Sequence, residues 1–307
     1  MKLVVIERKL LSDNYVRFVF KHAFKDLLPQ WEPGSHVDVK LPDGRLRQYS
    51  LVGDPDDLAQ YTIIIKKELQ GRGGSEWLFD RLRLGDFLRV SKPRNNFSVG
   101  ARSGVIIAGG IGVTPLIPIG RALSKDARLQ AFHFTSRESQ LLIAEELSRF
   151  CGDRLHLYTS IGPREKRMNI QSIINNTVPE TDVYVCGPDR LMTEVKQLTA
   201  HWSEDRVHHE SFQLDPDNSF KAEPFDLTVR RTGVTYRVKE NQTALDVLRR
   251  EGHVVPSSCR MGVCGTCKTR YVSGQVIHRD TLLSSTERQT EMLICVSRGR
   301  GSIMIDV

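Results

Sequence analysis

The chain has 307 residues, of which 39% are hydrophobic and 26% are charged. This length allows two or three domains with separate cores, and the composition is typical of a soluble globular protein. The formal net charge is +7, but no basic run with interleaved aromatic residues indicates nucleic-acid binding. No apolar run reaches the roughly 18 residues that a membrane span needs, and charged residues interrupt the N-terminal segment where a signal peptide would be apolar. We therefore expect a cytoplasmic protein with neither a membrane nor a nucleic-acid partner.

The first hundred residues alternate short β-type segments with turn sequences. The segments include KLVVIERKLL, YVRFVFKH, SHVDVKL and YTIIIKK, and the turns include PG, PDG and DPDD. Closely spaced strands separated by such turns predict a small antiparallel β-barrel rather than a βαβ domain. One short helix is predicted at residues 75–82.

The pattern changes near residue 103. Apolar strands such as GVIIAGG and DVYVCGP alternate with amphipathic helices, one of which is predicted at residues 117–125. This alternation predicts an α/β domain with an open parallel sheet that helices cover on both faces. A ligand of such a sheet binds beyond the carboxyl ends of the strands, which is where the glycines occur in this sequence.

Residues 212–224 contain two prolines and two aspartates without periodicity and are predicted to be an inter-domain linker. Beyond it we expect a hairpin that turns near Gly233, then a helix that Thr243 caps and that stops near Gly252. Lys and Arg number 18 against 13 Asp and Glu in the first domain, 13 against 15 in the second and 13 against 9 in the third, which gives net charges of +5, −2 and +4. The predicted domains are 1–102, 103–222 and 223–307.

Four of the six cysteines form a C-x4-C-x2-C run with a fourth member 27 residues later: Cys259, Cys264, Cys267 and Cys295. This spacing is typical of a plant-type [2Fe–2S] cluster, for which one tight loop supplies three thiolates and a later segment supplies the fourth. Gly262 and Gly265 let the loop turn sharply. A structural zinc site is the alternative, but it usually needs a second C-x2-C pair or two histidines, and neither is present. The two remaining cysteines do not suggest a disulfide framework.

Two motifs in the predicted barrel are suited to a ring cofactor that carries a phosphate. In the run 47–50 (RQYS), an arginine, an aromatic ring and a hydroxyl can meet a phosphate, a ring face and a ring heteroatom. The run 71–75 (GRGGS) opens a helix, so its N–H groups and the positive end of the helix dipole can meet an anion. An ordinary exposed strand edge and a flexible hairpin loop are the alternatives.

Two further motifs lie at strand ends of the predicted parallel sheet. Residues 109–115 (GGIGVTP) connect an apolar strand to a helix, where a pyrophosphate can approach a backbone that lacks Cβ atoms. The motif differs from G-x-G-x-x-G, and a generic strand-to-helix turn is the alternative. Residues 186–188 (CGP) place a thiol and a glycine at the same crevice, although a lone buried cysteine is more often a packing residue.

The ordered set R-x-Y-S, G-R-G-G-S, G-G-I-G-V-T-P, C-G-P and the four cysteines resembles the phthalate dioxygenase reductase family over essentially the whole chain. The resemblance implies three domains. They are an FMN-binding antiparallel barrel, a pyridine-nucleotide domain of the ferredoxin-NADP reductase type, and an α+β domain with the β-grasp fold of plant-type ferredoxins.

The resemblance also implies site residues. Those for FMN are Arg47, Tyr49 and Ser50 on one strand, Ile65 and Lys66 on another, and Gly73, Gly74 and Ser75 around the phosphate. Those for the nicotinamide side are Gly110, Gly112, Thr114, Cys186, Gly187 and Pro188. Ser136 and Arg137 would lie near the adenosine ribose. The family generally uses NADH, and an arginine at this place leaves NADPH open.

The sequence HESF at 209–212 is similar to the C-terminal element of this superfamily. The similarity implies that Glu210 lies near the hydride path and that Phe212 lies against the flavin ring. A satellite core residue is the alternative for Phe212. Hydride transfer needs no general acid or nucleophile, so the catalytic candidates Ser50, Cys186 and Glu210 are expected to position the reactants.

The function implied is a reductase that takes a hydride from NADH onto FMN and passes electrons singly through the cluster to a Rieske-type oxygenase of aromatic catabolism. A reductase for a cytochrome P450 is the alternative within this class. A redox-sensing module and a nucleic-acid-binding protein are alternatives from other classes. Arg260 in the cluster loop and Lys268 beyond it predict an oxygenase with an acidic docking face. We expect a monomer.

Overall fold

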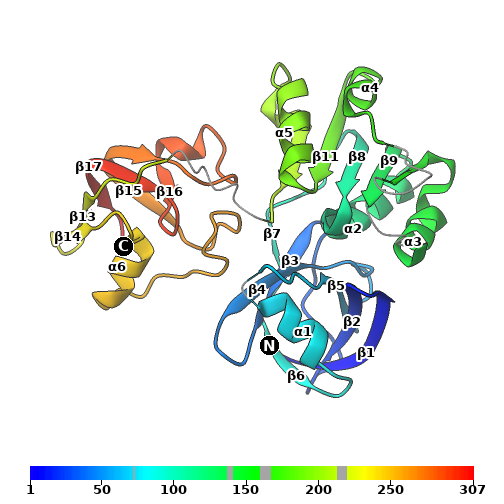
Figure 1. Ribbon diagram of the computed structural model, residues 1–307, viewed down its shortest axis with the longest axis horizontal. Helices are drawn as coiled ribbons and strands as arrows, with labels where there is room; N and C mark the ends of the chain where they lie inside the picture. Colours follow the sequence, from blue (N-terminus) through cyan, green and yellow to red (C-terminus); the bar gives the residue numbers. More distant parts are fainter. Residues whose placement is uncertain (72, 137–140, 160–166, 213–219) are drawn as a thin grey trace. The chain divides into compact units, whose positions relative to one another are not determined.

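The computed structural model describes residues 1–71, 73–136, 141–159, 167–212 and 220–307. The chain forms two compact units, Met1–Glu210 and Ser211–Val307, and each is described by itself (Figure 1). Among the described residues, none of the helices combines the length and apolar character required to span a bilayer.

The first half of the first unit is an antiparallel sheet with the strand order β4-β3-β6-β1-β2-β5, and β7 pairs with β3. The strands are β1 (Lys2–Ser12), β2 (Tyr15–His22), β3 (Ser35–Lys40), β4 (Leu46–Ser50), β5 (Tyr61–Lys66), β6 (Phe87–Val90) and β7 (Arg94–Asn95). An antiparallel bridge between Leu51 and Ile63 brings the β4 edge to the β5 edge, so the sheet curls into a barrel. Helix α1 (Gly74–Arg81) packs against β5 and buries Leu78 and Phe79. The predicted antiparallel barrel is confirmed.

The second half of the first unit is a parallel sheet with the strand order β10-β9-β8-β11-β12. Its strands are β8 (Ser103–Gly109), β9 (Leu129–Ser136), β10 (Leu155–Thr159), β11 (Thr181–Cys186) and β12 (Val207–Glu210). The connecting helices are α2 (Val113–Lys125), α3 (Leu141–Cys151), α4 (Ile170–Asn175) and α5 (Asp189–Leu198), with 3-10 turns at Gly110–Gly112, Gly152–Arg154 and Glu204–Arg206.

The helices cover both faces of this sheet, as predicted. Helices α2 and α3 contact each other, and so do α4 and α5. Along β8, Val105 and Ile107 pack with α4 and α5, whereas Ile106 lies beside Gly120 of α2. The strand order changes direction at β8, so the crevice expected for a ligand lies at the carboxyl ends of β8 and β11.

Helix α2 begins at Val113, four residues before the helix predicted at 117–125. Pro115 lies in the first turn of the helix. Backbone N–H groups there have no intrahelical acceptor, so a proline, which lacks the N–H, is tolerated. Arg121 of the same helix donates to the carbonyl of Gly53 at 2.6 Å and ties the parallel sheet to the barrel.

The second unit is a mixed five-stranded sheet with the order β14-β13-β17-β15-β16, and β13 runs parallel to β17. Its elements are β13 (Phe225–Val229), β14 (Thr235–Val238), α6 (Ala244–Arg250), β15 (Lys268–Ile277), a 3-10 turn (Glu287–Gln289), β16 (Glu291–Leu293) and β17 (Arg298–Ile305). The hairpin turns at Gly233, which has φ +69°. Thr243 and Asp246 form a capping box at the start of α6. Helix α6 and the sheet share one core, which confirms the predicted α+β fold of the third domain.

Candidate functional site

The phosphate end of the predicted flavin site is formed by β4 and the start of α1. Gly73 has φ +74° and is the N-cap of α1, and no side chain caps the helix. The first-turn N–H groups of α1 are therefore available to an anion. The Arg47 side chain runs against Gly74, where an added Cβ would collide with the Arg47 guanidinium. A cation and a helix N-terminus thus meet at one place, which fits a phosphate.

The strand register divides the predicted flavin residues between two faces of the barrel wall. On β4, Arg47 and Tyr49 lie opposite Val39 and Val37 of β3, whereas Ser50 lies opposite His36. Burial raises the pKa of Tyr49, so the phenol stays uncharged. Ser50 and the His36 side chain are both buried.

The remaining residues predicted for FMN lie on or beside β5 and α1. Ile65 is fully buried in the barrel core, so only its backbone can face a ligand. Lys66 is ion-paired with Glu68 at 3.4 Å. The hydroxyl of Ser75 accepts from the backbone N–H of Glu68 at 3.1 Å, which fixes the glycine loop to β5.

The glycine turn after β8 packs tightly against the end of β11. A Cβ on Gly112 would collide with the Cys186 carbonyl, and a Cβ on Gly109 would lie 2.7 Å from Pro188. Gly110, with φ +54°, is open, since its Cβ would lie 3.9 Å from the Tyr15 hydroxyl. Gly110, Gly112 and the 186–188 segment therefore meet at one crevice.

Of three predicted positions around this crevice, Cys186 and Thr114 are buried and Glu210 is half-buried. Cys186 lies beside Glu210 in the parallel register of β11 and β12. Burial, and then the charge of Glu210, raise the pKa of the Cys186 thiol well above its usual value. Burial raises the pKa of the Glu210 carboxyl to about 8. The hydroxyl of Thr114 donates to the Ile111 carbonyl at 2.9 Å and stabilises the glycine turn.

The cluster loop is shaped by three residues with positive φ: Gly262 at 71°, Gly265 at 68° and Arg260 at 57°. Its four cysteines are all buried and free. They lie in two neighbouring pairs, Cys259 with Cys264 and Cys267 with Cys295, in which each thiol affects the pKa of its partner.

Two neighbouring thiol pairs fit a cluster with two irons, each of which takes two thiolates. The hydrogen bond from Cys259 lowers the pKa of Cys264 to about 5, and the one from Cys295 lowers the pKa of Cys267. Ionised thiolates are the form that binds metal ions, iron and zinc alike. The pairing of the four thiols, two for each iron, is the feature that fits [2Fe–2S].

Three family models match successive parts of the chain: the oxidoreductase FAD-binding domain at residues 2–99, the oxidoreductase NAD-binding domain at 106–197 and the 2Fe-2S iron-sulfur cluster binding domain at 227–299. The phthalate 4,5-dioxygenase oxygenase reductase subunit of Pseudomonas putida is 34% identical over 309 residues, which cover 99% of this chain and 95% of that protein. The chain belongs to the phthalate dioxygenase reductase family. It is an electron-transfer oxidoreductase with flavin, NAD and [2Fe–2S] domains.

Two solved structures extend this comparison. The structure of phthalate dioxygenase reductase matches this family member with a TM-score of 0.71 at 31% identity, over 100% of this chain and 98% of that chain. An intact type IV self-sufficient cytochrome P450 monooxygenase matches with a TM-score of 0.89 at 32% identity, over 100% of this chain but only 41% of that chain. The three-domain architecture thus occurs both as a separate protein and within a longer one.

Three further residues were predicted for the ribose and the flavin of this reductase. Ser136 is buried at the end of β9, one residue beyond Thr135, which pairs with Gly109, and its place near a ribose stays a prediction. Arg137 lies outside the described residues. Phe212 is half-buried and belongs to the second unit, which is described separately, so its contact with a flavin stays a prediction.

The structure adds one residue to the crevice of this family member that the sequence did not suggest. His36 Nδ1 lies 3.9 Å from Glu210 Oε1, and its side chain is only 3% exposed. The one available signal was that His36 is the second residue of the strand SHVDVK, in which a histidine is usually a core residue.

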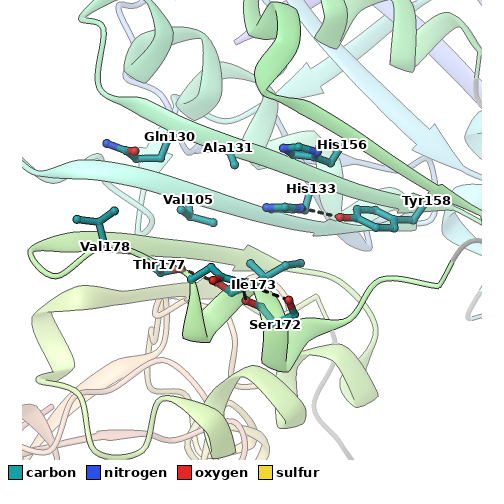
Figure 2. A pocket seen from close by; sticks show the side chains of 11 residues that line it. Val105, Gln130, Ala131, His133, His156, Tyr158, Ser172, Ile173, Thr177 and Val178 are labelled. Atoms are coloured by element: carbon teal, nitrogen blue, oxygen red, sulfur yellow. Dashed lines mark hydrogen bonds between the residues drawn. The ribbon is translucent and has the colours of Figure 1, made fainter.

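A separate cavity of about 340 Å³ lies on one face of the parallel sheet, between β9, β10 and α4 (Figure 2). His133 Nδ1 is 3.0 Å from the Tyr158 hydroxyl on its wall, and the His133 and His156 rings stack at 4.7 Å. Burial lowers the pKa of His133 to about 4. None of the residues predicted to bind cofactors lines this cavity.

Proposed function

We propose that this chain is the reductase component of a two-component Rieske-type oxygenase, and that it transfers electrons from NADH through FMN and a [2Fe–2S] cluster to the oxygenase. The proposal rests on one observation. A flavin barrel, a parallel nucleotide-binding sheet and a loop with two thiol pairs lie in a single chain, and this chain spans 95% of the phthalate 4,5-dioxygenase reductase subunit and 93% of the 3-chlorobenzoate-3,4-dioxygenase reductase subunit. The domain boundaries 1–102, 103–222 and 223–307 are part of the proposal.

Delivery of electrons to a haem protein is the second candidate. It is supported by the likeness to the self-sufficient P450 and by 36% identity to a heme-dependent oxidative N-demethylase beta subunit over 93% of this chain. Mixing the reduced protein with a purified Rieske oxygenase and, separately, with a P450 distinguishes the two. Rapid reduction of the P450 and not of the Rieske centre would overturn the first proposal.

In the hydride-transfer step of this mechanism the protein positions groups and supplies no general acid or nucleophile. A bound flavin accepts electrons in pairs and releases them singly. Arg47 and the α1 N-terminus hold its phosphate, and Tyr49 provides a flat apolar side chain. Ser50, Cys186 and Glu210 line the place where the nicotinamide must arrive, and their burial excludes water from that place.

FMN is proposed rather than FAD because the segment between β5 and the glycine loop is short. After Lys67, which follows β5, only residues 68–70 precede the loop, and they leave little chain for an adenine pocket. NADH is proposed as the donor, with NADPH as the other outcome of a coenzyme comparison. Acid extraction and chromatography identify the flavin, and recovery of FAD would refute this part of the proposal.

An acidic docking face on the oxygenase is proposed from the charge of the third domain, in which 13 Lys and Arg stand against 9 Asp and Glu. The oxidised cluster on four thiolates contributes about −2, which leaves the domain positive. The two cations predicted to attract the partner are both ion-paired in the structure: Arg260 with Asp246, and Lys268 with Glu287 at 3.0 Å. The steering therefore depends on the overall field and not on these two cations alone.

Stopped-flow cluster oxidation at several salt concentrations tests the docking proposal, and a rate that ignores salt would contradict it. Arg260→Glu alone is ambiguous, because it also places a carboxylate beside Asp246 of the capping box. Arg260→Gln, which removes the charge without repulsion, is the matched control. A cytoplasmic location, a monomeric state and the absence of nucleic-acid binding complete the proposal.

A further inference from the structure

A buried pair of titratable side chains lies at the predicted hydride site. His36 on β3 and Glu210 at the end of β12 are 3% and 14% exposed, and His36 Nδ1 is 3.9 Å from Glu210 Oε1. Among the described residues, both ring nitrogens of His36 and Oε2 of Glu210 are buried without a hydrogen-bond partner. Three unpaired polar atoms in one place are costly for a fold, which favours a functional reason for the pair.

The pair carries no net charge across the neutral pH range. Burial, and then the charge of Arg94, lower the pKa of His36 to about 4, and burial raises the pKa of Glu210 to about 8. Between these values Glu210 is a neutral acid and His36 a neutral base with a free nitrogen. The other titratable groups that face the pair are Asp38 and Arg94 beside His36, and Cys186 beside Glu210.

The reaction of the proposed function, on which this inference rests, leaves a proton at this place. A hydride carries two electrons and one proton, and both electrons leave singly for the acceptors. One proton therefore remains for every NADH oxidised. Cys186 cannot accept it, because burial keeps that thiol protonated. Strand register places Ser50 opposite His36 and Cys186 opposite Glu210, so the pair lies among the residues predicted to position the reactants.

We propose that His36 and Glu210 form the proton exit of the hydride site. Glu210 takes up the released proton on one carboxyl oxygen and gives its own proton to the free nitrogen of His36. The bond that held the released proton breaks as one O–H bond forms on Glu210, and the other O–H bond of Glu210 breaks as one N–H bond forms on His36. The imidazolium then gives its other N–H proton to water, and both side chains are neutral again. The 3.9 Å gap exceeds a hydrogen bond, and a small rotation of the Glu210 side chain closes it, as is common when a site fills.

The route continues toward the surface beside His36. Arg94 lies opposite His36 in the register of β3 and β7. Its guanidinium is 2.6 Å from Asp38 Oδ2, and its side chain is 34% exposed. The charges of Arg94 and Asp38 act on the imidazole, so this ion pair is the polar group beside which the proton leaves in the proposal. In this scheme His36 exchanges its proton with Glu210 and not with the reactants.

Proton release measured with a pH-indicator dye tests the proposal on the cofactor-loaded protein, with NADH as donor and ferricyanide as acceptor. The experiment follows a single turnover with one NADH per protein, because over many turnovers one proton must leave for every NADH oxidised in any variant. In the wild type, the proton should appear together with flavin reoxidation. In His36→Gln and His36→Asn, proton appearance should lag at least tenfold behind flavin reoxidation. His201→Gln, which changes an exposed histidine, should keep the two signals together. If the His36 variants also keep them together, the proposal is overturned. If the wild type fails to oxidise NADH, the proposed function fails instead.

Carbon NMR of the cofactor-free protein with labelled glutamate carboxyls provides a readout independent of turnover. Loss of one resonance in Glu210→Gln identifies the Glu210 carboxyl. In the wild type this resonance should titrate near pH 8 and respond again near pH 4, when His36 takes up its proton. The response near pH 4 should vanish in His36→Gln. An unchanged titration curve in that variant would show that the two groups are not coupled and would refute the pair.

Discussion

Replacing Glu210 with glutamine should stabilise the first unit, and the gain should grow with pH. Burial raises the pKa of Glu210 in the folded protein to about 8 from 4.5. Above pH 4.5 the unfolded chain ionises this group and the folded chain does not, so wild-type stability falls as the pH rises until it passes about 8. The loss is about 1.4 kcal/mol per pH unit. The difference in unfolding free energy between Glu210→Gln and the wild type should therefore be about 3 kcal/mol larger at pH 7 than at pH 4.5.

Urea unfolding followed by tryptophan fluorescence measures this gain in the cofactor-free protein. The three tryptophans, Trp31, Trp77 and Trp202, all lie in the first unit, so the signal reports that unit alone. The glutamine amide changes the unfolding free energy by an amount that does not depend on pH. The diagnostic quantity is therefore the slope, against pH, of the difference in unfolding free energy between variant and wild type. Glu145→Gln, at an exposed position, should give a flat difference. A flat difference for Glu210→Gln as well would refute the buried, protonated carboxyl.

Three further predictions concern the cofactor sites. Cys264→Ser should abolish cluster absorption and iron content while NADH still reduces the flavin, because the ligands lie in a separate unit; loss of flavin reduction would contradict the modular mechanism. Arg47→Ala should weaken FMN binding by roughly 1.5–3 kcal/mol in a fluorescence titration, whereas unchanged affinity would remove Arg47 from the phosphate site. Gly112→Ala should lower the urea stability of the first unit by about 1–3 kcal/mol, because its Cβ meets the Cys186 carbonyl; a neutral effect would show that the turn can relax.

The sequence was informative wherever a local pattern determines the structure. Alternating apolar residues and turn motifs predicted the barrel, apolar runs between helices predicted the parallel sheet, and cysteine spacing predicted the cluster loop. The cap of α6 was also predictable, because Thr243 and Asp246 interact within one helical turn. In each case residues close in the sequence carry the signal.

Contacts between distant segments were not predictable in this way. Nothing in the sequence places His36 beside Glu210, because the barrel wall and the last strand of the parallel sheet meet only in the folded unit. The reason for each glycine after β8 was likewise not predictable from the sequence. They were expected to make room for a pyrophosphate, but Gly112 is required by the backbone of Cys186 packed against it, and Gly110 is the open position.

The net charge of the third domain follows from composition, but the charges that a partner meets at contact depend on the ion pairs in the folded structure. Counting residues gives the sign of the field that a partner meets at a distance, because at long range only the sum of the charges matters. At contact range the pairing matters more. Arg260 is neutralised by Asp246 and Lys268 by Glu287, so neither presents an isolated charge next to the cluster. Salt should therefore slow the encounter with the oxygenase more than removal of either cation does, since salt screens the whole field and a single substitution alters one pair.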